Sequence, residues 1–409
     1  MSETSYPLHK IKVVLLENIH QDAVEAFEQA GFAVHHYTRA LNGAELIEAA
    51  ADAHIIGIRS KSHLKAEFFE AARRLWAVGC FCIGTNQVDL DAAAARGVPV
   101  FNAPFSNTRS VAELVIAEIV GLHRQLADRS TEMHGGRWVK SAAGAHEVRG
   151  RTLGIVGYGR IGSQVSVLAE AMGMRVIFHD VVDVLPLGNA RRARNLEELL
   201  QESDVVTLHV PATPDTRRMI GAAELGHMRP GAFLLNNARG SVVDVDALAE
   251  AISSKRLAGA AVDVFPREPS SNEEPFESPL RGLPNVILTP HIGGSTIEAQ
   301  RDIARGVSGK LIRLMNNGTT DTAVNFPEVQ LPVLHPRHHR ILHYHRNVPG
   351  VLGNLHSMIA REGVNIAAQH LQSNERYAYA ILDIDPDHGD DLNEKLMAVP
   401  ETIRVRTLW

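Results

Sequence analysis

Short apolar runs alternate with amphipathic segments along the first hundred residues of the chain. The apolar runs have the length of buried strands and lie at residues 12–16, 32–36, 54–58, 75–82 and 100–102. The segments between them repeat apolar residues at helical spacing, at residues 23–30, 44–51, 65–73 and 90–96. Strands that alternate with helices predict a parallel sheet covered by helices on both faces.

The same alternation resumes beyond a long amphipathic helix predicted at residues 111–126 and a polar segment that contains Trp138. Further apolar runs predict strands at residues 153–156, 175–179, 204–209, 232–236, 258–263 and 286–289. Helices are predicted at residues 222–227 and 245–254. This stretch therefore predicts a second doubly wound parallel sheet.

A helix predicted at residues 296–315 follows the completed second sheet, so we expect it to return to the first one. After a Pro- and His-rich linker, residues 340–409 have the βαββαβ order of a small ferredoxin-like module. The chain is too long for a single core. We predict a discontinuous substrate-binding domain at 1–107 and 295–330, a nucleotide-binding domain at 108–294 and a regulatory domain at 338–409.

A glycine-rich turn follows the strand that ends at Val156. Its sequence, Gly157-Tyr158-Gly159-Arg160-Ile161-Gly162, has the G-x-G-x-x-G spacing of dinucleotide-binding turns. Glycines at these positions permit a tight turn, a close pyrophosphate and close packing of helix on strand. Asp180 ends the next strand, where an acidic side chain binds the adenosine ribose and repels a 2′-phosphate. We predict a Rossmann domain that binds NAD, with a glycine-rich turn of another doubly wound fold as the alternative.

Composition and charge argue against a nucleic-acid-binding, a membrane-spanning or a secreted protein. The net charge of −6 argues against a nucleic-acid surface, and no apolar run is long enough to span a membrane. Cys80 and Cys82 lie two residues apart on one predicted strand, where they are poorly placed to form a disulfide with each other. The polar start, residues 1–10, lacks the apolar core of a signal peptide. These features predict a cytoplasmic protein with reduced thiols.

A dinucleotide cofactor implies hydride transfer. Removal of a hydride from an alcohol carbon also requires a base for the hydroxyl proton and a cation that orients the substrate's carboxylate. Loops after the predicted Rossmann strands supply candidates, namely Arg239, Asp263, Glu268 and His291. A carboxylate beside a histidine orients the ring and favours its protonated form. We therefore expect Glu268 to be the partner of His291.

A second group of polar residues, Arg59-Ser60-Lys61, follows the strand predicted at residues 54–58. Two cations beside a hydroxyl at the end of a parallel strand suit an anionic ligand. Ordinary solvated surface charge is the alternative for these residues.

These segments resemble the D-isomer-specific 2-hydroxyacid dehydrogenases. The likeness lies in Arg239-Gly240, in Asp263-Val264-Phe265 with Glu268-Pro269, and in residues 289–294, Thr-Pro-His-Ile-Gly-Gly. It implies that Arg239 binds the substrate, that His291 is the acid/base, that Glu268 is its partner and that Asp263 supports the nicotinamide. The cofactor-binding residues that it implies are Gly157, Tyr158, Gly159, Arg160, Ile161, Gly162, Asp180, His209, Val210, Pro211, Ala238, Arg239, Asp263, His291 and Gly294.

Longer strings, at residues 79–89, 101–113, 324–328 and 363–369, resemble the D-3-phosphoglycerate dehydrogenases of the bacterial, feedback-regulated type. The resemblance implies a homotetramer that oxidises 3-phosphoglycerate with NAD in serine synthesis, with Trp138 contacting a neighbouring subunit. It implies an ACT domain that binds L-serine between two copies through His345, Asn347 and Asn365. The substrate-binding residues that it implies are Arg59, Ser60, Lys61, Asn107, Arg239 and Gln300.

Some positions depart from that pattern. Lys61 replaces a more usual Arg, and Asn237-Ala238 replaces Ala-Ser. The linker also carries extra histidines, which form either a metal site or a solvated hinge. Two other functions therefore stay open. One is a related dehydrogenase of an unphosphorylated acid, or one that also reduces 2-oxoglutarate. The other is a dinucleotide-sensing binding protein without turnover.

Overall fold

The computed structural model describes residues 6–269, 273–389 and 391–409. By its internal contacts the chain forms two compact units. The first comprises Met1–Ser106 and Gln300–Trp409, and the second comprises Asn107–Ala299.

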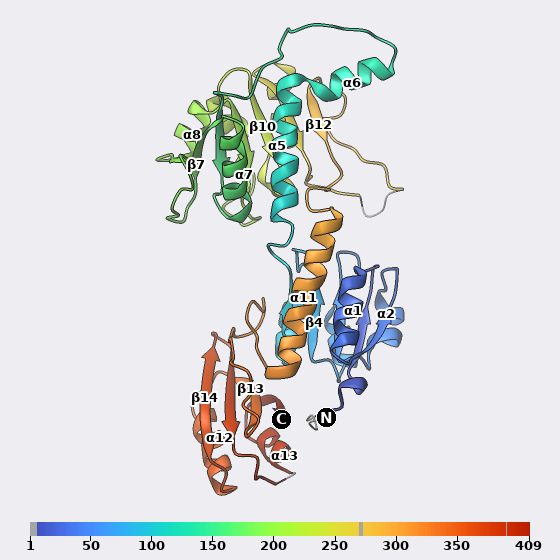
Figure 1. The fold of residues 1–409 in the computed structure, drawn as a ribbon, viewed down its shortest axis with the longest axis vertical. Helices are drawn as coiled ribbons and strands as arrows, with labels where there is room; N and C mark the ends of the chain where they lie inside the picture. The colour runs from blue at the N-terminus through green and yellow to red at the C-terminus, as the bar shows by residue number, and fades with distance from the viewer. Residues whose placement is uncertain (1–5, 270–272, 390) are drawn as a thin grey trace. The chain divides into compact units, whose positions relative to one another are not determined.

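The first unit contains a five-stranded parallel sheet in the order β2-β1-β3-β4-β5. Figure 1 shows this part of the chain in blue, with β4 labelled. Its strands are β1 (Lys12–Leu15), β2 (Ala33–His36), β3 (Ile55–Ile58), β4 (Ala77–Cys80) and β5 (Val100–Phe101). Its helices are α1 (Gln21–Gln29), α2 (Gly43–Ala50), α3 (Ala66–Ala71) and α4 (Leu90–Ala95), preceded by the short η1 (Leu8–Lys10). The strands are apolar because helices bury both faces of the sheet.

A long helix, α11 (Ile297–Asn317), lies along the same sheet. Its residues Ile303, Val307 and Leu311 are buried in one cluster with Ile55 and Phe101 of the strands. Gly79 of β4 allows this packing, because a Cβ there would stand 2.8 Å from side-chain atoms of Val307 and Leu311. The apolar stripe of α11 therefore completes the core of the first sheet.

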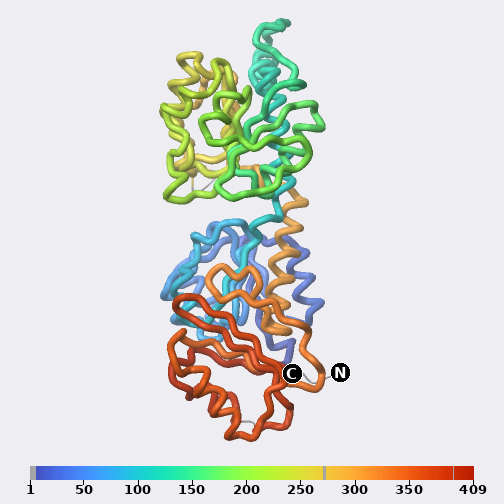
Figure 2. The backbone as a smooth tube through the Cα atoms, turned by 90° about the vertical axis from the view of Figure 1, so that its left-hand side faces the viewer, coloured from blue at the N-terminus to red at the C-terminus, as the bar shows by residue number. Residues whose placement is uncertain are grey.

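The C-terminal part of the first unit is a four-stranded antiparallel sheet with two helices, shown in red in Figure 2. Its strand order is β14-β15-β13-β16. Its elements are β13 (His339–Arg346), α12 (Val351–Arg361), β14 (Ile366–Ser373), β15 (Tyr377–Ile384), α13 (Leu392–Met397) and β16 (Thr402–Leu408). This is the βαββαβ order expected from the sequence.

The second unit contains a seven-stranded sheet in the order β12-β11-β10-β9-β6-β7-β8, all pairs parallel. Its strands are β6 (Thr152–Val156), β7 (Arg175–His179), β8 (Arg191–Arg192), β9 (Val205–Leu208), β10 (Ala232–Asn236), β11 (Leu257–Val262) and β12 (Val286–Leu288). Its helices include α5 (Thr108–Arg124), α7 (Arg160–Ala171), α8 (Leu196–Glu202), α9 (Ala222–His227) and α10 (Val245–Ser253), with η2 at Gly240–Val242. The strand order reverses beside β6, as in Rossmann folds. The predicted fold class is confirmed.

The predicted helix at residues 111–126 differs from the structure at its end. Helix α5 stops at Arg124, because Gln125 adopts a left-handed conformation with φ 50°. A second helix, α6 (Leu126–His134), begins directly after it, where the sequence indicated only a polar segment. Its residues are all partly or fully exposed, so no apolar stripe marked it.

No helix in the described part of the chain has the length and apolar character needed to cross a membrane.

Candidate active site

The glycine-rich turn joins β6 to α7 at the carboxyl end of the second unit's sheet. Gly157 has φ 91°, and a Cβ there would stand 2.7 Å from the carbonyl oxygen of His209. A Cβ on Gly162 would stand 2.2 Å from the carbonyl oxygen of Gly157, so only glycine lets the helix start this close to the strand. A Cβ on Gly159 would meet no atom within 4 Å. The turn thus leaves open space at the N-terminus of α7, where pyrophosphate binds in such folds.

The carboxylate of Asp180, after β7, is tied to the same turn. Its Oδ2 accepts a 2.7 Å hydrogen bond from the Tyr158 amide, and its Oδ1 accepts one of 2.9 Å from the Val182 amide. The Tyr158 side chain is buried, stacks on Phe178 at 3.9 Å between ring centroids and hydrogen-bonds Ser166. The Tyr158 amide is therefore bound to Asp180, and the Tyr158 ring supports the turn from the core.

His209, Val210 and Pro211 follow β9, beside the glycine-rich turn. The His209 ring shares a 3.1 Å hydrogen bond with Thr207, and its Nδ1 has no partner among the described residues. Burial lowers the pKa of His209 to about 3. The ring is therefore neutral and offers the site no positive charge.

Asp263, after β11, organises the loop that carries His291. Its side chain is almost fully buried and accepts hydrogen bonds from the Thr289 hydroxyl at 2.6 Å and from the Ile292 and Gly293 amides at 2.8 Å each. Its carbonyl also accepts the amide hydrogen of His291 at 2.8 Å. This network holds His291 in a left-handed conformation with φ 54°, which residues other than glycine rarely adopt.

His291 and Glu268 form the expected pair. The Nδ1 atom of His291 lies 2.9 Å from Oε2 and 3.1 Å from Oε1 of Glu268. Because a carboxylate only accepts, Nδ1 carries the proton and Nε2 is the basic atom. The hydrogen bond to Glu268, reinforced by its charge, raises the pKa of His291 although burial opposes this. Burial works against ionisation of Glu268, but hydrogen bonds from His291 and the Phe265 amide bring the pKa of its carboxyl below the usual value.

Arg239 lies in the loop after β10, next to the loop that carries Glu268. Gly240 permits the approach, because a Cβ there would stand 2.0 Å from the carbonyl carbon of Phe265. The Arg239 side chain is partly exposed and donates to the carbonyl of its neighbour Ala238 at 2.7 Å. Its charge also acts on both members of the His291–Glu268 pair. The structure therefore brings together Arg239, Asp263, Glu268 and His291 at the carboxyl edge of one sheet.

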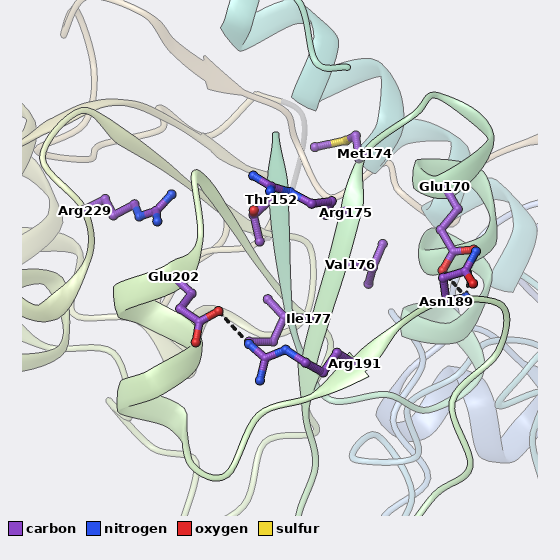
Figure 3. A pocket seen from close by; sticks show the side chains of 10 residues that line it. All are labelled: Thr152, Glu170, Met174, Arg175, Val176, Ile177, Asn189, Arg191, Glu202 and Arg229. Atoms are coloured by element: carbon purple, nitrogen blue, oxygen red, sulfur yellow. Dashed lines mark hydrogen bonds and ion pairs between the residues drawn. The ribbon is translucent and has the colours of Figure 1, made fainter. Parts of the chain in front are cut away.

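Next to the His291–Glu268 pair is a hollow of about 550 Å³ lined mainly by apolar residues. Its walls include Phe265, Phe276, Leu288 and Pro290. A second hollow of about 510 Å³ lies at the other end of the strands, where Thr152 begins β6 and Arg175 begins β7 (Figure 3). Figure 3 shows Arg191 of this second hollow paired with Glu202. Ligands of parallel α/β sheets bind at the carboxyl edge, so the first hollow is the better candidate.

A buried pair that was not predicted from the sequence lies under this edge. Glu118 of α5 is 3% exposed, and its Oε2 accepts a 3.0 Å hydrogen bond from the side-chain amide of Asn237. Burial raises the pKa of Glu118 to about 8, so the carboxyl is mostly neutral at pH 7. A charged residue on the apolar face of a predicted helix was the available signal.

The remaining substrate residues predicted by resemblance belong to both units, and each is described in its own unit. In the second unit, Asn107 contacts Gly294, where a Cβ would stand 2.2 Å from Asn107 Nδ2. In the first unit, Arg59 is half-buried while Ser60 and Lys61 are exposed, in the loop after β3. Gln300 lies in α11 and is partly buried.

The predicted effector residues separate into two groups along the C-terminal sheet. His345 lies near the end of β13, and Asn347 follows that strand and donates to the Asn374 carbonyl at 2.8 Å. Asn365 precedes β14 and pairs with Asp385 beyond the other end of β15. Along β15 the first group lies opposite Arg376 and Ala378 and the second opposite Asp385, so the register separates them by at least seven residues, on the order of 20 Å. One copy of the chain therefore does not bring all these side chains together.

Among the described residues, no group of three or more His, Cys, Asp and Glu side chains is placed to hold a metal ion. In the histidine-rich region, His339 Nδ1 lies 2.7 Å from His388 Nε2 and the His339 ring stacks on Trp409. These contacts are of histidine with histidine and with an aromatic ring.

Comparison with known proteins places the chain in a family. The family model of the D-isomer specific 2-hydroxyacid dehydrogenase, NAD binding domain, matches residues 116–293. The family model of the AHAS small subunit-like ACT domain matches residues 341–404. D-3-phosphoglycerate dehydrogenase of Haemophilus influenzae is 53% identical over the whole of both chains. The Escherichia coli K12 protein of that name is 52% identical, also over the whole of both. The chain belongs to the D-3-phosphoglycerate dehydrogenase family.

Solved structures agree with this membership. The TT0316 protein of Thermus thermophilus is 32% identical, with a TM-score of 0.69 over 76% of this chain and 99% of that one. D-lactate dehydrogenase of Aquifex aeolicus, solved with NAD and lactic acid, is 28% identical, with a TM-score of 0.66 over 78% and 100% of the two chains. The chain is an NAD-dependent dehydrogenase with a C-terminal ACT domain.

Proposed function

We propose that this enzyme oxidises 3-phospho-D-glycerate to 3-phosphohydroxypyruvate, the first step of L-serine synthesis. The observation that carries the proposal is the His291–Glu268 pair, joined at 2.9 Å beside Arg239 at the carboxyl edge of the NAD-binding sheet. The names of the full-length relatives supply the substrate. The division into substrate-binding, NAD-binding and ACT domains given above forms part of the same proposal.

His291 removes the proton of the substrate's 2-hydroxyl group. Its Nε2 is the available base because Nδ1 donates to Glu268. The carboxylate of Glu268 then stabilises the imidazolium that forms, and a general base of this kind contributes about 10²- to 10⁴-fold to the rate. A bound NAD would supply the acceptor for the hydride that leaves C2, the carbon that bears this hydroxyl group. In the reverse direction the imidazolium returns the proton.

Two positive regions orient the substrate in this proposal. The guanidinium of Arg239 binds the carboxylate and polarises the carbonyl of the oxo acid. The side chains of Arg59 and Lys61 bind the phosphate, helped by Ser60, Asn107 and Gln300. The cofactor is held by the open glycine-rich turn and by Asp180, whose position at the end of β7 suits a ribose hydroxyl.

L-Serine is proposed to inhibit through the ACT domain. His345 Nδ1 donates to the Arg346 carbonyl at 2.9 Å, so Nε2 is an acceptor, and it has no partner among the described residues. Burial lowers the pKa of His345, which keeps the ring neutral and able to accept from an ammonium or hydroxyl group. Because Asn365 lies at the other end of the sheet, the effector site needs a second copy of the domain.

We further propose a homotetramer located in the cytoplasm. Trp138 is 79% exposed in the segment after α6, and neighbouring Val139 is 45% exposed. Exposed aromatic residues of this kind are typical of subunit contacts. Sedimentation of the Trp138→Ala variant tests this, because loss of the contact gives smaller particles at micromolar concentration.

Oxidation of NADH with 3-phosphohydroxypyruvate, with and without L-serine, tests the proposal. Turnover that serine inhibits supports the substrate, the cofactor and the effector together. Turnover that serine leaves unchanged retains the enzyme and removes the serine site. Turnover only with 2-oxoglutarate or an unphosphorylated oxo acid assigns the chain to a sister activity, and an absence of turnover with NADH binding retained favours a binding protein.

A further inference from the structure

The loop that carries Arg59, Ser60 and Lys61 is held by a carboxylate with no assigned role. This carboxylate belongs to Glu17, just after β1, while the loop follows β3, the hydrogen-bonded neighbour of β1. Parallel neighbours end at the same edge of a sheet, so Glu17 and the loop meet there. Glu17 is only 8% exposed, although glutamate is rarely buried without a specific partner.

Both oxygens of Glu17 accept hydrogen bonds from the backbone of this loop. Its Oε1 accepts from the amides of Arg59 at 3.0 Å and Ser62 at 2.8 Å. Its Oε2 accepts from the amide of Lys61 at 2.9 Å. Neighbouring backbone amides of this kind often form a cradle for a phosphate ligand. In this chain Glu17 itself occupies the cradle.

Gln87 also holds this loop, through a hydrogen bond to one of the loop's backbone carbonyl groups. The Nε2 atom of Gln87 donates to the Arg59 carbonyl at 2.6 Å, and the Gln87 side chain is almost fully buried. Ser60 and Lys61 stay exposed and Arg59 stays half-buried. The loop therefore has a fixed backbone and accessible polar side chains, which lowers the entropy lost when a ligand binds.

The backbone at Glu17 supports this arrangement. Glu17 and Asn18 have φ values of 63° and 52°, a left-handed conformation that is uncommon for glutamate and easier for asparagine. Their amides donate to the carbonyls of Arg39 and Tyr37 at 3.1 Å each, which holds the turn in this conformation. A strained conformation that neighbouring groups maintain is typical of functional sites.

We propose that Glu17 is a positioning residue for the phosphate of the substrate. Because Glu17 saturates the amides of Arg59, Lys61 and Ser62, the phosphate is bound by the side chains of Arg59 and Lys61 and not by these amides. The inference rests on the proposed function of this loop. It adds that the affinity for the phosphate depends on Glu17, a buried and negatively charged side chain. Glu17 holds in place the loop that carries the cations Arg59 and Lys61.

The Glu17→Gln variant of the full-length enzyme tests this proposal. The amide keeps the size of the side chain but loses the charge and one acceptor. We expect the KM for 3-phosphohydroxypyruvate to rise about tenfold, as for loss of a hydrogen bond to a charged group. The kcat, the Kd for NADH and the KM for hydroxypyruvate, which has no phosphate, stay within about twofold because the loop contacts only the phosphate. Glu70→Gln, at an exposed position of α3, is the matched control and leaves all four values unchanged.

A second variant keeps the proposal testable if Glu17→Gln does not fold. Gln87→Met keeps the volume but removes the donor to the Arg59 carbonyl, so the same selective rise in KM is expected. An unchanged KM in the folded variants overturns the proposal. Equal changes in the KM of both oxo acids also overturn it.

The double variant Arg59→Gln/Lys61→Gln separates this inference from the proposed function. If it raises the KM for 3-phosphohydroxypyruvate while Glu17→Gln does not, the positioning role of Glu17 fails alone. If the double variant leaves that KM unchanged, the proposed role of the loop fails, and the role of Glu17 fails with it.

Discussion

One ion pair of this chain lies at the carboxyl edge of the seven-stranded NAD-binding sheet, here called the rim. Another lies inside the four-stranded antiparallel sheet of the ACT domain, here called the ACT sheet. At the rim, the side chains of His291 and Glu268 are 52% and 38% exposed and share contacts of 2.9 and 3.1 Å. In the ACT sheet, the side chains of Arg340 and Asp383 are 0% and 9% exposed and form two hydrogen bonds of 2.6 and 2.7 Å.

The two pairs differ in what their charges can do. Arg340 also donates to the carbonyls of Asn317 at 3.1 Å and Pro332 at 2.9 Å, so its guanidinium is bound on every side. An arginine does not change its charge at accessible pH. His291 binds Glu268 through Nδ1 only, and the hydrogen bond to that carboxylate raises its pKa. We therefore expect pairs of similar length to have different roles, catalysis at the rim as proposed above and stability in the ACT sheet.

The largest expected effect is the loss of turnover when the histidine of the rim pair is replaced. His291→Ala removes the base, so we expect kcat for 3-phosphohydroxypyruvate reduction to fall about 10²- to 10⁴-fold. Fluorescence titration should give an unchanged Kd for NADH. A kcat within a few-fold of the wild type would remove His291 as the acid/base.

Arg340→Met tests the buried pair. It leaves the Asp383 carboxylate buried and unpaired, which costs about 3–5 kcal/mol of unfolding free energy. Urea unfolding, followed by circular dichroism, measures this loss. The double variant Arg340→Met/Asp383→Leu is the control, because an apolar pair of similar size should recover most of the stability. A single variant as stable as the wild type would contradict the structural role.

Glu268→Gln should change the pH dependence at the rim. The mutation removes the hydrogen-bonded charge that raises the pKa of His291, so that pKa falls. Reduction needs the imidazolium, hence its rate should decline at a lower pH than in the wild type, and turnover near pH 7.5 should fall about ten- to hundredfold. The pH profiles of kcat/KM for both proteins give the measurement. Identical profiles would mean that Glu268 does not tune His291.

Asp180→Ala examines a third carboxylate, which is partly exposed and holds two backbone amides. Removing it should weaken NAD binding and relax the preference for NAD over NADP by about tenfold, because the ribose contact and the repulsion of a 2′-phosphate both disappear. The ratio of kcat/KM for the two cofactors measures the effect. An unchanged ratio would count against the ribose role.

The smallest expected effect is on stability. The pKa of His291 is raised in the folded state, so its stabilising contribution is complete below the unfolded pKa and is lost as pH rises through the folded pKa. The pKa of Glu268 is lowered, so its contribution is lost as pH falls through the folded pKa. Between these limits we expect less than about 1 kcal/mol, because both side chains are solvent-exposed. Unfolding curves of the wild type and Glu268→Gln across pH 4–9 test this, and a larger difference would contradict it.

Much of the fold follows from sequence because buried parallel strands are short apolar runs. The turn at Gly157–Gly162 and the positions of Arg239, Glu268 and His291 after strands follow from the same pattern. Helix α8 was missed although the sequence carries its signals, because Asn195 caps its first turn and Leu199 and Leu200 form its buried face. Helix α6 was missed because a polar helix lacks an apolar stripe.

The carboxylates Glu17 and Glu118 were missed for a different reason. Each is a single charged residue in an apolar stretch, and its partner lies far away in sequence, in the 59–62 loop or at Asn237. Only the order of strands in the sheet places β1 beside β3 and so gives Glu17 its role. The separation of Asn365 from His345 likewise depends on strand register.

We propose that the rim pair, His291 and Glu268, performs chemistry and that the ACT pair, Arg340 and Asp383, stabilises the fold. The most direct test measures kcat and the urea midpoint on the same preparations of His291→Ala and Arg340→Met. We predict that His291→Ala loses turnover and keeps the wild-type midpoint. Arg340→Met should unfold at lower urea and keep its turnover at low urea. If both variants lose turnover and stability in proportion, the two pairs have the same role and the claim is contradicted.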